Sequence, residues 1–157
     1  MLQALLVAFQ PATTRSVLPV DPGMINWLAV VIATVAAFFT GGLWYSVLFG
    51  KPWIASQGYT PEQVEVMKAN MNPVTFFGGM LVSYFVLATM IAVIVVRFDL
   101  HTPLQGIKVG LALWVAVAAV TMTNHLASNK KFAGYLIDVS CDLVYLVAMG
   151  AIIGSWW

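Results

Sequence analysis

Two aspartates lie inside an otherwise apolar stretch near the end of the chain. Asp138 and Asp142 are four residues apart, a spacing that puts both side chains on one face of a helix. A carboxylate that faces lipid costs about 3 kcal/mol on membrane-insertion scales. We therefore expect both carboxyl groups to point into the protein and to find hydrogen-bonding partners there, or to hold a proton.

Polar side chains at matching heights in the other apolar stretches are the candidate partners. Counting inward from the loops at about 1.5 Å per residue gives a shallower group, roughly 5–10 Å deep, and a deeper group at about 15 Å. The shallower group is Tyr45, Ser46, Asn124, His125 and Asp138, and the deeper group is Thr40, Ser83, Tyr84 and Asp142. The spacing predicts that these side chains gather in one half of a membrane.

This polar set has two interpretations. The first is a cavity, open to one membrane face, that binds a small ligand or passes protons; its candidate residues are Tyr45, Ser83, Tyr84, Asn124, His125, Asp138 and Asp142. The second is a set of interhelical hydrogen bonds that hold the helices together. The sequence leaves both open.

The sequence gives little support for a metal ligand or a catalytic nucleophile. His125 could ligate a metal or the magnesium of a chlorin, but no second histidine follows at i+3 or i+4, so a hydrogen-bonding role is favoured. Cys141 is the only cysteine, and its thiolate would be repelled by both aspartates. We predict no metal, no cofactor and no catalytic residue, and therefore no enzyme.

The composition is that of an integral membrane protein. Hydrophobic residues make up 61% of the 157 and charged residues 8%, with a mean hydropathy of +0.91, whereas soluble domains carry about 25% charged residues. The net charge of +1 and the lack of a basic run argue against a nucleic-acid partner. The lipid bilayer is the expected partner.

Four stretches satisfy the requirement of roughly 20 apolar residues for a membrane crossing. We predict an all-α bundle of four transmembrane helices in a domain at 24–157, with spans at about 25–49, 74–96, 104–127 and 132–157. Asn72-Pro73 and Thr102-Pro103 are typical helix starts, and Gln105 stands where a capping box requires it.

The first loop has a helix signal of its own. Thr60-Pro61 repeats the start signal, and Val64, Met67 and Met71 follow at helical spacing. We expect a short amphipathic helix at about 61–70 that lies on the membrane surface.

Tryptophans mark the expected ends of the spans. Trp27 and Trp53 are 26 residues apart, or about 39 Å along a helix, which matches a bilayer with its interfaces. Gly50 and Pro52 are expected to end the first helix, and Lys51 to meet the headgroups. Trp156 and Trp157 anchor the last helix in the same way.

The loops and the start of the chain bear on topology. Residues 1–23 begin with an apolar run that no Lys or Arg precedes, so we expect a retained tail, docked on the membrane or on a partner, rather than a signal peptide. The excess of lysines in the first and third loops predicts that both loops are cytoplasmic. Those lysines are Lys51, Lys68, Lys130 and Lys131, against Arg15, Arg97 and Lys108 on the other side.

Several short segments resemble a known family. They are N-W-L-A-V at 26–30, W-Y-S-x-x-F-G-K-x-W at 44–53, N-H at 124–125, and I-D with a later Y-L-V-x-x-M-G-A-I at 137–152. Over roughly 24–157 the chain resembles a bacterial family of small four-helix membrane proteins of unknown function. The resemblance implies a multi-pass protein of the bacterial inner membrane and supplies no activity.

Two functions are therefore expected. The first is a non-catalytic accessory subunit of a larger membrane complex, of the respiratory or photosynthetic kind, with other membrane subunits as partners. The alternative is a small carrier or proton-linked transporter that uses the polar cavity.

Overall fold

The described part of the chain is helical. The structure, a computed structural model, describes residues 20–128 and 130–156, and every element among them is a helix. The long ones are α2 (Trp27–Leu43), continued by η2 (Trp44–Leu48), then α5 (Pro73–Arg97), α6 (Pro103–Ala127) and α7 (Phe132–Gly154).

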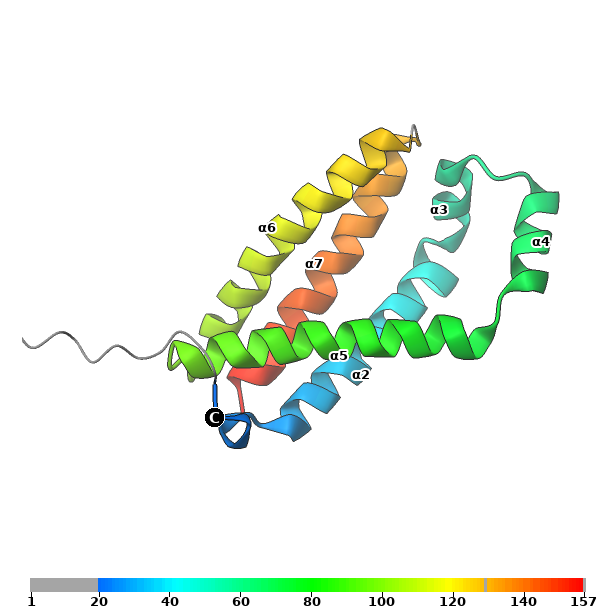
Figure 1. Cartoon of the computed structure of the whole chain (residues 1–157). Coiled ribbons are helices and arrows are strands. Elements are labelled where there is room, and N and C mark those ends of the chain that lie inside the picture. The colour runs from blue at the N-terminus through cyan, green and yellow to red at the C-terminus, as the bar shows by residue number, and fades with distance from the viewer. Residues whose placement is uncertain (1–19, 129, 157) are drawn as a thin grey trace, which may run out of the picture.

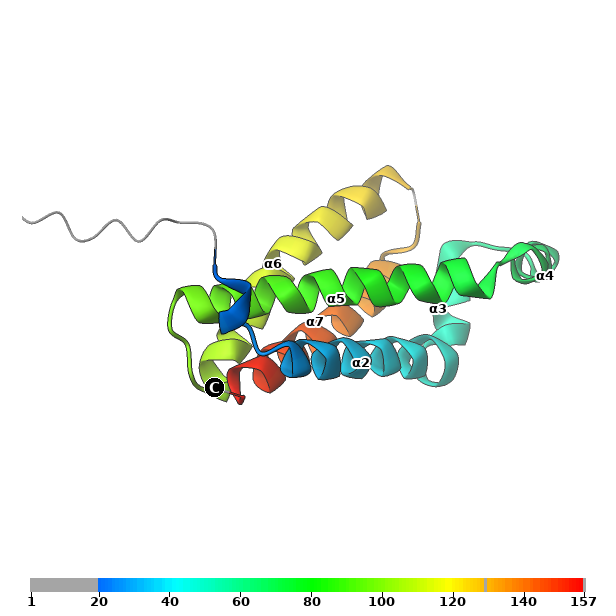
Figure 2. The ribbon, with the colours of Figure 1, turned by 60° about the horizontal axis from the view of Figure 1, so that its bottom comes forward.

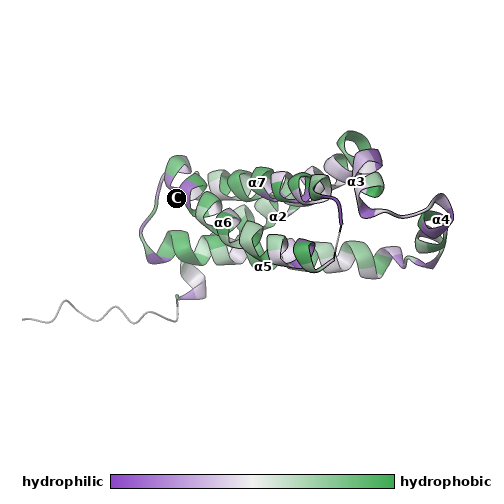
Figure 3. Cartoon of the chain, turned by 90° about the horizontal axis from the view of Figure 1, so that it is seen from above, coloured by the Kyte–Doolittle hydropathy of each residue, from purple (hydrophilic) through white to green (hydrophobic). Residues whose placement is uncertain are grey.

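Within the described residues, four helices are long and apolar enough to cross a membrane. Hydrophobic residues cover their middles and hydrophilic residues lie at the ends and loops (Figure 3). The predicted all-α, multi-pass architecture is confirmed. The docked tail was predicted for residues that lie mostly outside the described chain, as does Trp157.

The helices begin where the capping signals predicted. Asn72 accepts hydrogen bonds from the backbone N–H groups of Val74 and Thr75, and Pro73 opens α5. Thr102 caps α6 by accepting from the N–H of Gln105. The expected capping box is incomplete there, because the Gln105 side chain accepts from the Thr102 hydroxyl instead of from its backbone.

The first loop holds two short helices, α3 (Gly50–Gln57) and α4 (Pro61–Asn70). Thr60 and Gln63 cap α4 with both bonds of a capping box. That α4 lies on a membrane surface stays a prediction.

The first span ends close to the predicted position, but in a π-helical turn that leads directly into another helix. In η2 the N–H of Phe49 donates to the carbonyl of Trp44, five residues earlier, at 2.7 Å, which makes a π-helical turn. The chain then starts α3 at Gly50, with Pro52 in its first turn, where the missing N–H costs nothing. The span therefore ends within one residue of the predicted position, and Gly50 and Pro52 begin a second helix, which was not predicted.

Helices α6 and α7 run side by side in both Figure 1 and Figure 2 and approach each other through glycines. A Cβ atom on Gly106 would overlap the carbonyl oxygen of Gly150, and one on Gly110 would overlap that of Leu146. Small residues let membrane helices approach closely and gain dispersion contacts. The pair α6–α7 is therefore the tightest contact in the bundle.

Helix α5 crosses this pair at an angle (Figure 1). All four of its buried residues, Ala88, Ile91, Ala92 and Val95, lie in its second half. There they pack on the small residues of α2 and on the end of α7. The bundle is consequently dense toward the loop at 98–102 and splayed toward the first and third loops.

Replacing Gly106 with alanine tests the α6–α7 contact. The added methyl group meets backbone atoms. We therefore expect the free energy of unfolding to fall by about 1–3 kcal/mol, the usual cost of overpacking. Thermal unfolding of purified protein in detergent, followed by circular dichroism, measures this loss. Gly78→Ala is the matched control, because a Cβ there meets nothing within 4 Å and alanine favours the helix. Equal melting of the two variants would contradict the close contact.

Candidate functional site

The carboxyl group of Asp138 is held by two side chains of the first span and its extension. The hydroxyl of Tyr45 donates to Asp138 Oδ1 at 2.7 Å, and the indole N–H of Trp53 donates to the same oxygen at 2.8 Å. The two rings meet edge to face, with centroids 5.6 Å apart. We call Tyr45, Trp53 and Asp138 the Asp138 clamp.

The bend between η2 and α3 makes this clamp possible. Tyr45 and Trp53 are eight residues apart and would lie about 12 Å apart along one straight helix. The turn at Phe49 redirects the chain so that both side chains reach Asp138. Gly50 is required at the turn, because a Cβ there would overlap the Tyr45 carbonyl oxygen.

Hydrogen bonds to backbone carbonyls around the clamp hold η2 and α3 against α7. The indole N–H of Trp44 donates to the Ile137 carbonyl at 3.1 Å, and the N–H of Lys131 donates to the Ser56 carbonyl at 3.3 Å. Ser56 is buried, with 3% of its surface exposed. It fits against Gly134, where a Cβ atom would lie only 2.6 Å from the serine hydroxyl.

A polar pocket of about 130 Å³ opens beside the clamp. It lies among α3, the end of α6, the third loop and the start of α7. Its lining residues are Gln57, Thr121, Asn124, His125, Ser128, Lys130 and Asp138. Three predicted site residues, Asn124, His125 and Asp138, thus share one pocket.

His125 was expected at the height of Asp138 as a partner. The structure gives the hydrogen bonds of Asp138 to Tyr45 and Trp53. The His125 ring instead packs near Tyr135, with centroids 5.8 Å apart, and near Phe132, at 6.3 Å. Asn124 is exposed at the rim.

The second aspartate forms a separate group deeper in the bundle. The hydroxyl of Tyr145, one turn along α7, donates to Asp142 Oδ1 at 2.8 Å. Tyr84 of α5 packs its ring edge on Tyr145, with centroids 5.0 Å apart. Ser83 is exposed and donates to the Gly79 carbonyl of its own helix. The seven candidate residues therefore divide among the pocket with its clamp, the Asp142 group and the outer surface.

The sequence placed Tyr45 at the height of Asp138 but did not indicate the other two donors, Trp53 and Tyr145. Trp53 was interpreted as an interface anchor, yet its indole N–H bonds Asp138, while Tyr145 was not considered as a partner of Asp142. Its i+3 position on the same helix was an available signal. Nothing in the sequence predicted the bend that turns Trp53 inward.

The described residues offer little for metal binding. No group of three or more His, Cys, Asp or Glu side chains gathers among residues 20–128 and 130–156. Each buried side-chain nitrogen or oxygen in this part of the chain has a hydrogen-bond partner. What the site offers is a carboxyl group fixed by two donors, beside a small polar pocket.

Removing one donor tests the clamp. We expect Tyr45→Phe to lower the free energy of unfolding by about 1 kcal/mol, because a half-buried acceptor loses one of its two donors. In an Asp138→Ala background the same change should cost much less. Unfolding of all four proteins in detergent gives the coupling free energy of the pair. Additive effects would show that the hydrogen bond contributes nothing.

Comparison with known proteins places the chain in a family. Residues 28–154 match the family described as protein of unknown function (DUF1761). Neither the curated proteins nor the solved structures contain a match. The match covers most of the chain, including the clamp, the pocket and all but the first residue of the four spans. The chain therefore belongs to the DUF1761 family of proteins of unknown function.

Proposed function

We propose that the protein is a non-catalytic accessory subunit of a larger assembly in the bacterial inner membrane. The observation that carries the proposal is the outer face of the first half of α5. This half is splayed from the bundle, and most of its exposed side chains are apolar, with Val74 83% exposed and Val82 65% exposed. Thr75 and Ser83 are the exposed polar exceptions.

Two glycines on this half of α5 support a protein partner. Lipid chains are as apolar as leucine, so membrane helices associate where small residues let backbones approach. The glycines at 106, 110, 150 and 154 are occupied by the α6–α7 contact. Gly78 and Gly79 are not, since a Cβ on either would meet nothing within 4 Å. They offer a surface on which a helix of another subunit can pack.

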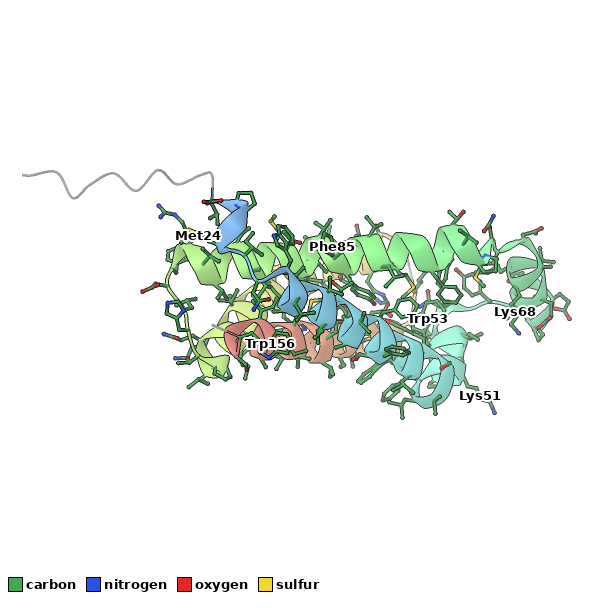
Figure 4. All side chains as sticks on the ribbon, turned by 90° about the horizontal axis from the view of Figure 1, so that it is seen from below. Met24, Lys51, Trp53, Lys68, Phe85 and Trp156 are labelled. Atoms are coloured by element: carbon green, nitrogen blue, oxygen red, sulfur yellow. The ribbon has the colours of Figure 1, made fainter. Side chains whose placement is uncertain are left out.

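The same proposal assigns an orientation. Lys51 and Lys68 lie toward one end of the molecule and Met24 and Trp156 toward the other (Figure 4). With Lys130 and Lys131 in the third loop, the lysine-rich end is the cytoplasmic one under the positive-inside rule.

Bulk at Gly78 tests the docking surface. We expect Gly78→Leu to release the protein from its assembly while its own fold survives, because leucine favours helix and the position is open. Native mass spectrometry of gently solubilised membranes measures the assembly. Ala116→Leu, on the exposed surface of α6, is the control and should leave the assembly intact. A wild-type protein that emerges as a stable monomer with no other protein bound would exclude the proposal.

A carrier is the second candidate, supported by the polar pocket beside Asp138. A proton-linked carrier needs a titratable group that solvent can reach from one face, and Asp138 lines a pocket that contains polar groups. On this proposal, Asp138→Asn together with Asp142→Asn abolishes proton flux into proteoliposomes, measured with an entrapped pH-sensitive dye under an imposed potential. Wild-type vesicles that carry no flux above protein-free vesicles would rule it out.

A further inference from the structure

A larger, apolar groove lies on the other side of the first span. It has a volume of about 760 Å³ and runs between α2, η2 and α3 on one wall and the first half of α5 on the other. Aromatic rings dominate both walls, with Phe38 and Phe39 on α2 facing Phe76 and Phe77 on α5. The volume lies within the range of pockets that hold small ligands.

The groove is apolar even where its lining residues carry polar groups, because those groups are already hydrogen-bonded. The Tyr45 hydroxyl and the Trp53 indole N–H are both bonded to Asp138, on the far side of the first span. The hydroxyl of Ser46 donates to the Gly42 carbonyl of its own helix at 2.5 Å. With these groups satisfied, the groove favours an apolar occupant and disfavours a polar one, which would lose its hydration without compensation.

Two glycines on α2 widen the groove. Gly41 and Gly42 both line it, and a Cβ atom on Gly42 would meet nothing within 4 Å. The space in front of Gly42 is therefore large enough for added atoms.

The length of the groove selects the kind of occupant. On the first span its lining runs from Phe38 to Ser46, about 12 Å along the helix. That is close to half of the roughly 30 Å hydrocarbon core, so the groove serves one leaflet. A helix from another protein would cross both leaflets, whereas the acyl chain of a lipid fills one.

A positively charged residue, Lys51, lies next to the shallow end of the groove without lining it. Gly50, Trp53 and Ile54 line this end, and the exposed side chain of Lys51 follows Gly50 directly. Lys51 and Trp53 lie toward the same end of the molecule (Figure 4). A lysine at headgroup level attracts the phosphate of an anionic lipid.

We propose that this groove binds one acyl chain of an anionic phospholipid from the leaflet on the first-loop side, with its phosphate at Lys51. The lipid supports the splayed half of α5 where the chain itself supplies no core. This inference is separate from the Gly78 test of the accessory-subunit proposal, because Gly78 is two residues from both Phe76 and Met80, a spacing that points it to another side of α5 than the groove. Gly79 is three residues from Phe76 and lies nearer the groove.

The test places a larger side chain in the groove. Wild-type protein, Gly42→Leu and the control Ala116→Leu are purified in detergent, delipidated and offered phosphatidylglycerol with palmitoyl and oleoyl chains. Native mass spectrometry then counts the lipid retained per protein chain. We expect the wild type and the control to retain one lipid, and Gly42→Leu to bind at least about tenfold more weakly. The leucine occupies open space and favours the helix, so circular dichroism should show an unchanged fold.

Each other outcome overturns the proposal. Equal lipid retention by wild type and Gly42→Leu would place the lipid elsewhere. A wild-type dimer that holds no lipid, and that Gly42→Leu converts to a monomer, would assign the groove to a second copy of the chain. Retention of phosphatidylcholine, which is zwitterionic, as strongly as phosphatidylglycerol would remove the role of Lys51.

Discussion

A carboxyl group within a hydrophobic span has to find its hydrogen bonds inside the protein, and Asp138 shapes the surrounding structure through this requirement. Water is absent from the bilayer core, so an unpaired polar group there costs several kcal/mol. Asp138 meets the requirement with a hydroxyl and an indole that come from opposite sides of a bend. The π-helical turn at 44–48 and the glycine at position 50 make the bend that brings these two donors to one oxygen, and the packing of Ser56 on Gly134 holds α3 in place beside it.

Packing without a hydrophobic driving force explains why the two ends of the bundle differ. In lipid, helices are held by close backbone approach and by hydrogen bonds. The end near residues 98–102 is held by close backbone approach, with glycines between α6 and α7 and alanines between α2 and α5. The other end uses hydrogen bonds, through the clamp. There the first half of α5 has no buried residue, although its Phe77 ring packs on Phe38 of α2. Both cavities lie at this second end: the polar pocket between α3 and the α6–α7 pair, and the apolar groove between the first span with α3 and α5.

The number, length and order of the long helices could be predicted because each depends on local sequence. Apolar runs set the spans, and Asn72-Pro73 and Thr102-Pro103 set two of the starts. The gathering of polar groups was predictable from depth alone, which correctly put Tyr45 level with Asp138. Depth carries no information about direction around the helix axis, so Ser83 was included although it faces outward. For the same reason His125 was predicted to be a partner of Asp138, whereas its ring packs near Tyr135.

The bend was beyond prediction for a different reason. Gly50 and Pro52 are as compatible with the end of a helix as with the first turn of a new one, and only the demand of Asp138 for a second donor selects the latter. Trp53 shows how much depends on that choice. On a straight continuation of α2 it would be the interface anchor that its position suggests, whereas after the bend its indole ties the first loop to α7. The same ring thus forms part of one wall of the apolar groove while its N–H bonds Asp138, so the shape of the groove and the hydrogen bonding of Asp138 both depend on a single turn.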